Sequence, residues 1–91
     1  MKVRAHVFVS GKVQGVFFRS EITRQARRLG VNGWVRNLPN GRVEAVFEGE
    51  RESITRLVNV CAQGPSTAVV ESVNVVWEDY ADEFRSFTVK R

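Results

Sequence analysis

The chain begins with a regular alternation of apolar and polar residues. One set of alternate positions is apolar and consists of Val3, Ala5, Val7 and Val9. The positions between them are mostly polar and include Arg4 and His6. A period of two is typical of a β-strand with one buried face. This segment is therefore predicted to be a half-buried strand, with His6 on its solvent side.

Two further strand-like runs lie in the middle of the chain, at residues 31–38 and 42–48. They are joined by Pro39-Asn40-Gly41, whose proline and glycine suit a type I turn closed by a left-handed residue. This region is predicted to be a β-hairpin. Near the C-terminus, residues 69–78 are rich in β-branched side chains, and Phe87 and Val89 indicate a short last strand.

Two segments carry apolar residues at helical spacing instead. In the first, from about Arg19 to Leu29, Ile22 and Ala26 recur on one side, and Gly30 supplies a C-terminal stop. The second opens with acidic residues after Gly49 and ends at Gly64-Pro65. Its apolar positions follow the i, i+3, i+4, i+7 pattern and are Ile54, Leu57, Val58 and Cys61. Both segments are predicted to be amphipathic helices.

The order β-α-β-β-α-β with a final strand predicts the α+β class. We expect a ferredoxin-like split βαβ sandwich, in which an antiparallel sheet carries two helices on one face. In that topology the first two strands are parallel, because each is antiparallel to the third, which lies between them. Their C-terminal ends share one edge of the sheet. The loop after Ser10 and the strand end near Asn37 should therefore lie within reach of one long side chain.

Length and composition restrict the class of protein. The 91 residues suffice for one domain but not for two cores, so residues 1–91 are expected to form a single domain. The chain starts with Met1 and ends just beyond its last predicted strand, so we expect it to be complete. There is no apolar run of membrane-spanning length and no signal-peptide stretch at the N-terminus. We therefore expect a cytoplasmic protein without a membrane partner.

The few residues able to bind metals or act as nucleophiles exclude several chemistries. Cys61 is the only cysteine and His6 the only histidine, so neither an internal disulfide nor a zinc site of Cys and His ligands is possible. Cys61 falls on the apolar side of a predicted helix and is expected to be a small buried hydrophobe. The net charge of +4 favours an anionic partner, either a metabolite or a nucleic acid. No metal or cofactor is expected.

The segment from Gly11 to Phe18 leads directly into the first predicted helix. Free N–H groups and the positive end of the helix dipole make such a junction an anion site. The loop matches neither the Walker A pattern nor the dinucleotide pattern. Arg19 would oppose the dipole unless an anion lay between them, and its guanidinium suits phosphate oxygens. On these features alone, an exposed arginine at a frayed helix end is an equally good interpretation.

Asn37 is the polar residue that the topology places opposite this loop. A primary amide both donates and accepts hydrogen bonds, so it could hold a water and a substrate oxygen at once. Taken alone, however, an asparagine just before Pro39 is usually a residue that caps backbone groups beside a turn.

Two segments resemble the signatures of the acylphosphatase family. The first is Val9-Ser10-Gly11-Lys12-Val13-Gln14-Gly15-Val16-Phe17-Phe18-Arg19; the second is Gly33-Trp34-Val35-Arg36-Asn37, followed by Gly41-Arg42-Val43 and Gly49. Gly64-Pro65 and the strand with Val73 and Val75 resemble later segments of the family, so the resemblance covers nearly the whole chain. It implies a ferredoxin-like fold and the metal-free hydrolysis of acyl phosphates to a carboxylate and inorganic phosphate, without a phosphoenzyme.

The resemblance also implies roles for individual residues. Arg19 matches the phosphate-binding arginine, and Asn37 matches the asparagine that orients the attacking water. The residues that match the loop whose amides wrap the phosphate are Gln14, Gly15, Val16, Phe17 and Phe18. Leu38 stands where some relatives have a hydroxyl residue, so no help from a hydroxyl is expected there. The resemblance implies a small-molecule acyl phosphate as the partner, and the protein is expected to be a monomer.

Two other classes of function fit part of the pattern. An RNA-recognition module has a similar order of elements, and Trp34 and Trp77 could stack on bases, but the alternating glycine and aromatic pattern of such modules is missing. Arg24, Arg27 and Arg28 form a basic helix face that is better explained as a solvated surface. No nucleic acid is therefore expected as a partner. A regulatory anion-binding module without catalysis is the other alternative, and the presence of both Arg19 and Asn37 argues against it.

Overall fold

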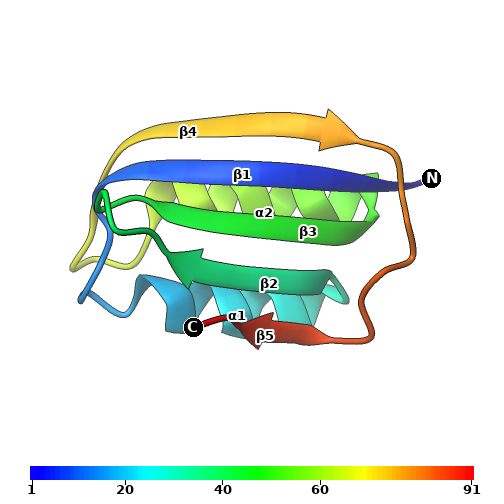
Figure 1. Cartoon of the computed structure of the whole chain (residues 1–91), viewed down its shortest axis with the longest axis horizontal. Helices are drawn as coiled ribbons and strands as arrows, with labels where there is room; N and C mark the ends of the chain where they lie inside the picture. The colour runs from blue at the N-terminus through cyan, green and yellow to red at the C-terminus, as the bar shows by residue number, and fades with distance from the viewer.

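The segments predicted as strands form one sheet in the computed structural model, which describes residues 1–91. The strands are β1 (Lys2–Lys12), β2 (Asn32–Asn37), β3 (Val43–Glu50), β4 (Val69–Glu78) and β5 (Phe87–Val89). They lie side by side in the order β4-β1-β3-β2-β5 (Figure 1). The parallel relation of β1 and β2 on either side of β3 is as predicted.

The direction of β5 modifies the predicted sheet. The connection 79–86 leaves β4 and crosses to the end of the sheet where β2 begins (Figure 1), so β5 runs in the same direction as β2 and pairs with it in parallel. The other strand pairs are antiparallel. The predicted ferredoxin-like α+β fold is confirmed, with a mixed sheet rather than a purely antiparallel one.

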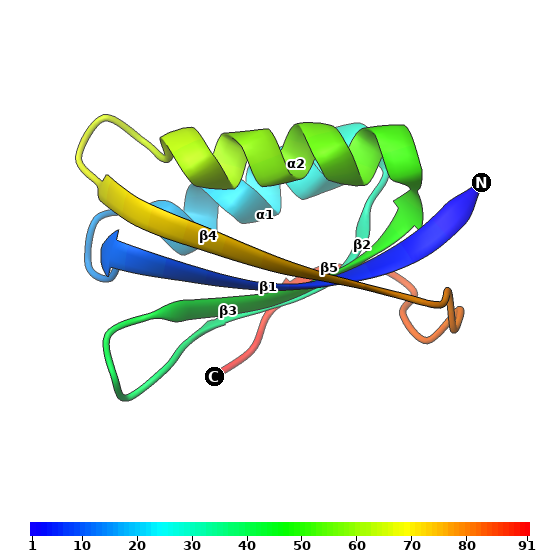
Figure 2. The same cartoon turned by 90° about the horizontal axis from the view of Figure 1, so that it is seen from above.

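The two helices are α1 (Phe18–Leu29) and α2 (Arg51–Gln63), and both lie on one face of the sheet (Figure 2). α1 ends at Gly30, whose φ of 71° is left-handed, as expected of a helix C-terminus. Neither helix is long and apolar enough to cross a membrane.

The core lies between the helices and the sheet. The predicted apolar face of β1 is buried at Ala5, Val7 and Val9, and it packs in one cluster with Ile22 of α1 and Leu57 of α2. Cys61 is also buried in this cluster, as expected. Because burial disfavours the thiolate, the pKa of Cys61 is raised to about 12, and this thiol is unsuited to nucleophilic chemistry.

The segments in which a site was predicted meet at one end of the sheet, which we call the site end. β1 and β2 end there, and α1 begins there (Figure 1). The pairing of β1 with β4 shifts between Ser10 and Gly11, and at Gly11 a Cβ would lie only 2.2 Å from the backbone oxygen of Val69. Only glycine permits this close approach, so it fixes the direction in which the chain leaves β1.

Candidate active site

The loop between β1 and α1 is anchored by apolar side chains. Val13, Val16 and Phe18 are buried, whereas Gly15 and Phe17 between them are exposed. The buried residues fix the loop against the core and leave its backbone at the surface. The sequence pattern of this loop is therefore one of anchors alternating with exposed positions.

Two side chains from other parts of the fold tether the same loop. The side-chain amide of Gln14 donates to the carbonyl oxygens of Leu38 and Arg42, at 2.8 and 2.9 Å, and so bridges the loop to the β2–β3 hairpin. Thr67, which follows α2, donates through Oγ1 to the carbonyl oxygen of Val16 at 2.8 Å. The loop after β1 and the end of β2 were predicted to lie within reach of one long side chain, and the side chain of Gln14 spans this distance. Sequence reasoning missed the tether from Thr67, whose only signal was a hydroxyl residue shortly after Gly64-Pro65.

The backbone N–H groups of this region have no partners within the protein. None of the amides from Gln14 to Ser20 donates a hydrogen bond, and the first paired amide is that of Glu21, which donates to the carbonyl oxygen of Phe17 at 3.1 Å. Phe17 is the N-cap of α1, and no side chain caps this helix end. The loop and first turn therefore present a group of free donors at the positive end of the helix dipole.

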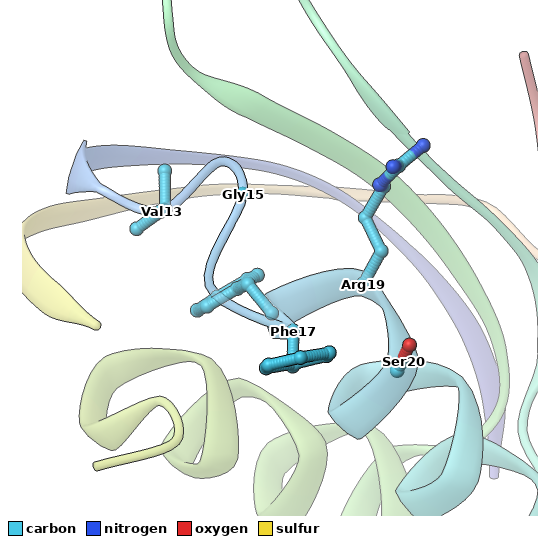
Figure 3. A pocket seen from close by; sticks show the side chains of 6 residues that line it. Val13, Gly15, Phe17, Arg19 and Ser20 are labelled. Atoms are coloured by element: carbon cyan, nitrogen blue, oxygen red, sulfur yellow. The ribbon is translucent and has the colours of Figure 1, made fainter. Parts of the chain in front are cut away.

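Arg19 lies in the first turn of α1 beside these donors. A hollow of about 240 Å³ is lined by Val13, Gly15, Phe17, Phe18, Arg19 and Ser20. Figure 3 shows the Arg19 side chain extending away from the helix backbone at the side of the hollow. No carboxylate of the chain pairs with Arg19. Its positive charge therefore adds to the attraction for an anion.

The acidic residue nearest to Arg19 in α1 is engaged elsewhere. Both carboxylate oxygens of Glu21 accept hydrogen bonds from Nη2 of Arg24, at 2.9 Å each. The hydrogen bonds from Arg24, with one from Gln25, lower the pKa of this carboxyl group. Glu21 is thus held on the outer face of α1 and leaves the charge of Arg19 uncompensated.

Asn37 is the last residue of β2 and pairs in register with Val43. Its side-chain oxygen Oδ1 is buried, and it is the only buried side-chain nitrogen or oxygen atom without a hydrogen-bond partner. Buried polar atoms are usually paired, so this carbonyl oxygen stands out as an acceptor that the protein itself does not use.

The predicted site residues do not all line one surface. Gly15, Phe17, Phe18 and Arg19 line the hollow, whereas Gln14, Val16 and Asn37 do not. The side chain of Gln14 and the carbonyl group of Val16 anchor the loop to other parts of the fold. Asn37 directly precedes Leu38, one of the two residues to which Gln14 ties the loop. The chain has no group of three or more His, Cys, Asp or Glu side chains that could hold a metal ion. The arrangement can bind an oxyanion through backbone amides and one guanidinium.

The family model, the similar sequences and the similar structures all point to one family. Residues 5–89 match the model of the acylphosphatase family. The chain is similar to the acylphosphatase of Pelotomaculum thermopropionicum, with 57% identity over 88 residues that cover 97% of this chain and 96% of that protein. It is also similar to the structure of an acylphosphatase from Coxiella burnetii, with a TM-score of 0.88 and 44% identity over 98% of this chain and 93% of the other. The acylphosphatase structure from Bacillus subtilis has a TM-score of 0.94 at 27% identity and covers 98% of this chain and 99% of its own.

Proposed function

The chain belongs to the acylphosphatase family and is an acylphosphatase, and we propose that it hydrolyses acyl phosphates with a phosphate cradle at the start of α1 and a water oriented by Asn37. One observation carries this proposal. The free amides from Gln14 to Ser20, the unpaired Arg19 and the unpaired Oδ1 of Asn37 all belong to segments that meet at one edge of the sheet.

The cradle holds the phosphoryl group of the substrate. The free amides between Gln14 and Phe18 donate to its oxygens, and the dipole of α1 favours the negative charge. The loop needs little rearrangement to do this, because Gln14 and Thr67 already fix it on two sides. Such preorganised donors stabilise a transition state without a reorganisation cost at the moment of reaction.

Arg19 supplies the positive charge of the site. Its planar guanidinium can donate two parallel hydrogen bonds to two phosphoryl oxygens, a geometry that lysine lacks. The contact exists in the bound substrate and in the transition state. Arg19 should therefore contribute to binding as well as to turnover.

Asn37 orients the attacking water. When the substrate binds, the amide turns so that its oxygen, which has no partner in the protein, accepts a hydrogen bond from the water and its nitrogen donates to a phosphoryl oxygen. The two contacts place the water oxygen in line with the bond that breaks. Orientation of this kind acts mainly on the rate of the chemical step.

The reaction balances without a protein nucleophile or base. The water oxygen forms a bond to phosphorus, the bond from phosphorus to the acyl oxygen breaks, and the carboxylate leaves with the electron pair. One proton of the water passes to a phosphoryl oxygen, which yields inorganic phosphate. Because a carboxylate is already a good leaving group, positioning and charge stabilisation suffice.

We also propose that the enzyme works as a cytoplasmic monomer on small-molecule substrates.

Hydrolysis in water enriched in ¹⁸O tests this mechanism. Attack at phosphorus places one ¹⁸O atom in the inorganic phosphate and none in the carboxylate, which mass spectrometry of both products measures. Single-turnover kinetics should give no burst of carboxylate ahead of phosphate, because no phosphoenzyme forms. Label in the carboxylate would mean attack at the carbonyl carbon, and a burst would mean a covalent intermediate; either result contradicts the proposal.

A further inference from the structure

Phe17 combines two features that are unfavourable for an aromatic residue. Its side chain is 76% exposed, and its backbone is left-handed, with φ 63° and ψ 19°. Among the residues other than glycine, only Phe17 and Asp82 have a positive φ. Aspartate tolerates this conformation comparatively well, whereas a bulky side chain there is an outlier. Glycine or asparagine would fit the backbone at position 17 better.

The other exposed large apolar residues have local explanations. Met1 is the chain terminus, and Val69, Val76 and Trp77 lie on the edge strand β4. β-branched and aromatic residues are favoured in strands, so their presence there follows from secondary structure. No such preference accounts for phenylalanine at the N-cap of a helix.

The position of Phe17 gives its side chain a use. Phe17 lines the same hollow as Arg19, and it stands between the buried anchors Val16 and Phe18. Thr67 holds the carbonyl group of the preceding residue. The ring is therefore carried by a fixed backbone at the mouth of the phosphate cradle.

We propose that the ring of Phe17 is a binding surface for the acyl group and gives the enzyme a preference for acyl phosphates with a flat, apolar acyl group. This inference rests on the proposed function, since it places the phosphoryl group in the cradle. The amides and Arg19 then hold the phosphoryl oxygens, and the acyl group is the part of the substrate that extends beyond them to the rim. An exposed aromatic ring there loses water contact when a planar apolar group covers it.

The test compares two substrates in four proteins. Benzoyl phosphate presents an aromatic acyl group, and acetyl phosphate presents a single methyl group. The ratio of their kcat/KM values is measured for the wild type, Phe17→Gly, Phe17→Tyr and Val76→Ala. The ratio cancels any change in the phosphate cradle that affects both substrates alike. Glycine accepts the left-handed backbone, so Phe17→Gly should fold, and a thermal melt checks this.

In Phe17→Gly the ratio of benzoyl to acetyl phosphate should fall by about 3- to 10-fold, the size of one aromatic contact. It should be retained in Phe17→Tyr, which keeps the ring, and in Val76→Ala, which removes another exposed apolar side chain far from the loop. An unchanged ratio in Phe17→Gly, even with both rates lowered, would overturn the inference, since the ring would then only shape the loop. Failure of the proposed function looks different: the wild type would release phosphate from neither substrate, or the label would enter the carboxylate.

Discussion

The loops at the two ends of the sheet differ in whether the protein supplies acceptors for their backbone amides. At the end away from the β1–α1 loop, where the connection 79–86 runs (Figure 1), Glu48 of β3 is only 2% exposed. The carboxylate of Glu48 accepts hydrogen bonds from the amides of Ala81 and Glu83, at 2.9 Å each, and Arg4 lies beside it with Nη1 at 3.5 Å. At the site end, the amides from Gln14 to Ser20 and the guanidinium of Arg19 have no anion of the protein to bind.

The two ends differ in the source of the anion that their donors bind. Both ends combine backbone amides with one arginine, but only the far end contains its own anion, in Glu48. That end is complete in the folded chain. Its arginine is also held by a hydrogen bond to Glu83, which raises the pKa of Arg4. The site end has the same kinds of donors and lacks the acceptor. A substrate phosphate would play there the part that Glu48 plays at the other end.

The largest expected effect comes from removing the cation of the site end. Arg19→Ala should abolish substrate binding and turnover together, because the guanidinium contacts phosphate in the ground state and in the transition state. The matched control is Arg24→Ala, five residues further along α1, whose side chain is paired with Glu21. Phosphate release and equilibrium binding of inorganic phosphate are the measurements. Unchanged affinity in Arg19→Ala would refute the role of this arginine.

A smaller effect on binding separates Asn37 from Arg19. Asn37→Ala should leave KM close to that of the wild type and lower kcat by roughly 10² to 10³, the scale of losing one oriented transition-state contact. Asn32 lies at the other end of the same strand, where its side chain donates to the carbonyl oxygen of Phe84. Asn32→Ala should therefore keep kcat. Full turnover in Asn37→Ala would remove this residue from the mechanism.

Removing the internal anion should affect stability and spare catalysis. Glu48→Ala leaves the amides of Ala81 and Glu83 without acceptors, so the free energy of unfolding should fall by about 2–4 kcal/mol. The activity per folded molecule should stay close to that of the wild type. Glu50→Gln on the same strand, where the side chain is exposed and pairs with the N-terminus, should leave the free energy of unfolding nearly unchanged. Urea titrations with activity assays measure both effects, and a large loss of kcat in folded Glu48→Ala would undo the division between the two ends.

The smallest effect concerns the strain at the site end. Phe17→Gly should raise the free energy of unfolding by about 1 kcal/mol, because glycine adopts the left-handed backbone without the steric conflict of a side chain. Thermal unfolding would detect this as a shift of a few degrees. A destabilised Phe17→Gly protein would mean that the ring supports the fold, against its exposure.

The sequence predicted those features that depend on periodicity and connection order. Strand β1 was predicted from its alternation, and helix α1 from its helical spacing and the stop at Gly30. The split βαβ order then predicted that the segments of Arg19 and Asn37 meet at one end of the sheet. The direction of β5 was missed, because a strand of three residues carries no pattern that reveals its partner. It depends on where the connection 79–86 crosses the sheet.

The details of the site depend on side-chain directions, which periodicity does not determine. Gln14 was predicted to contribute its backbone amide to the phosphate loop; that its side chain also ties the loop to the hairpin could not be read from the sequence. The left-handed backbone of Phe17 was not foreseen, because the residue type argues against it. His6 was placed on the solvent side, where its Nε2 lies 2.6 Å from the carboxylate of the buried Glu44. A buried carboxylate on that face could not be inferred from alternation alone.

A crystal structure of the protein grown in phosphate would show whether an oxyanion occupies the site end. We expect one phosphate ion at the start of α1, bound by amides of the Gln14–Phe18 loop and by both terminal nitrogens of Arg19, with Asn37 joined to it directly or through a water. A phosphate-free hollow at saturating concentration, or a guanidinium turned away from the loop into solvent, would contradict this expectation.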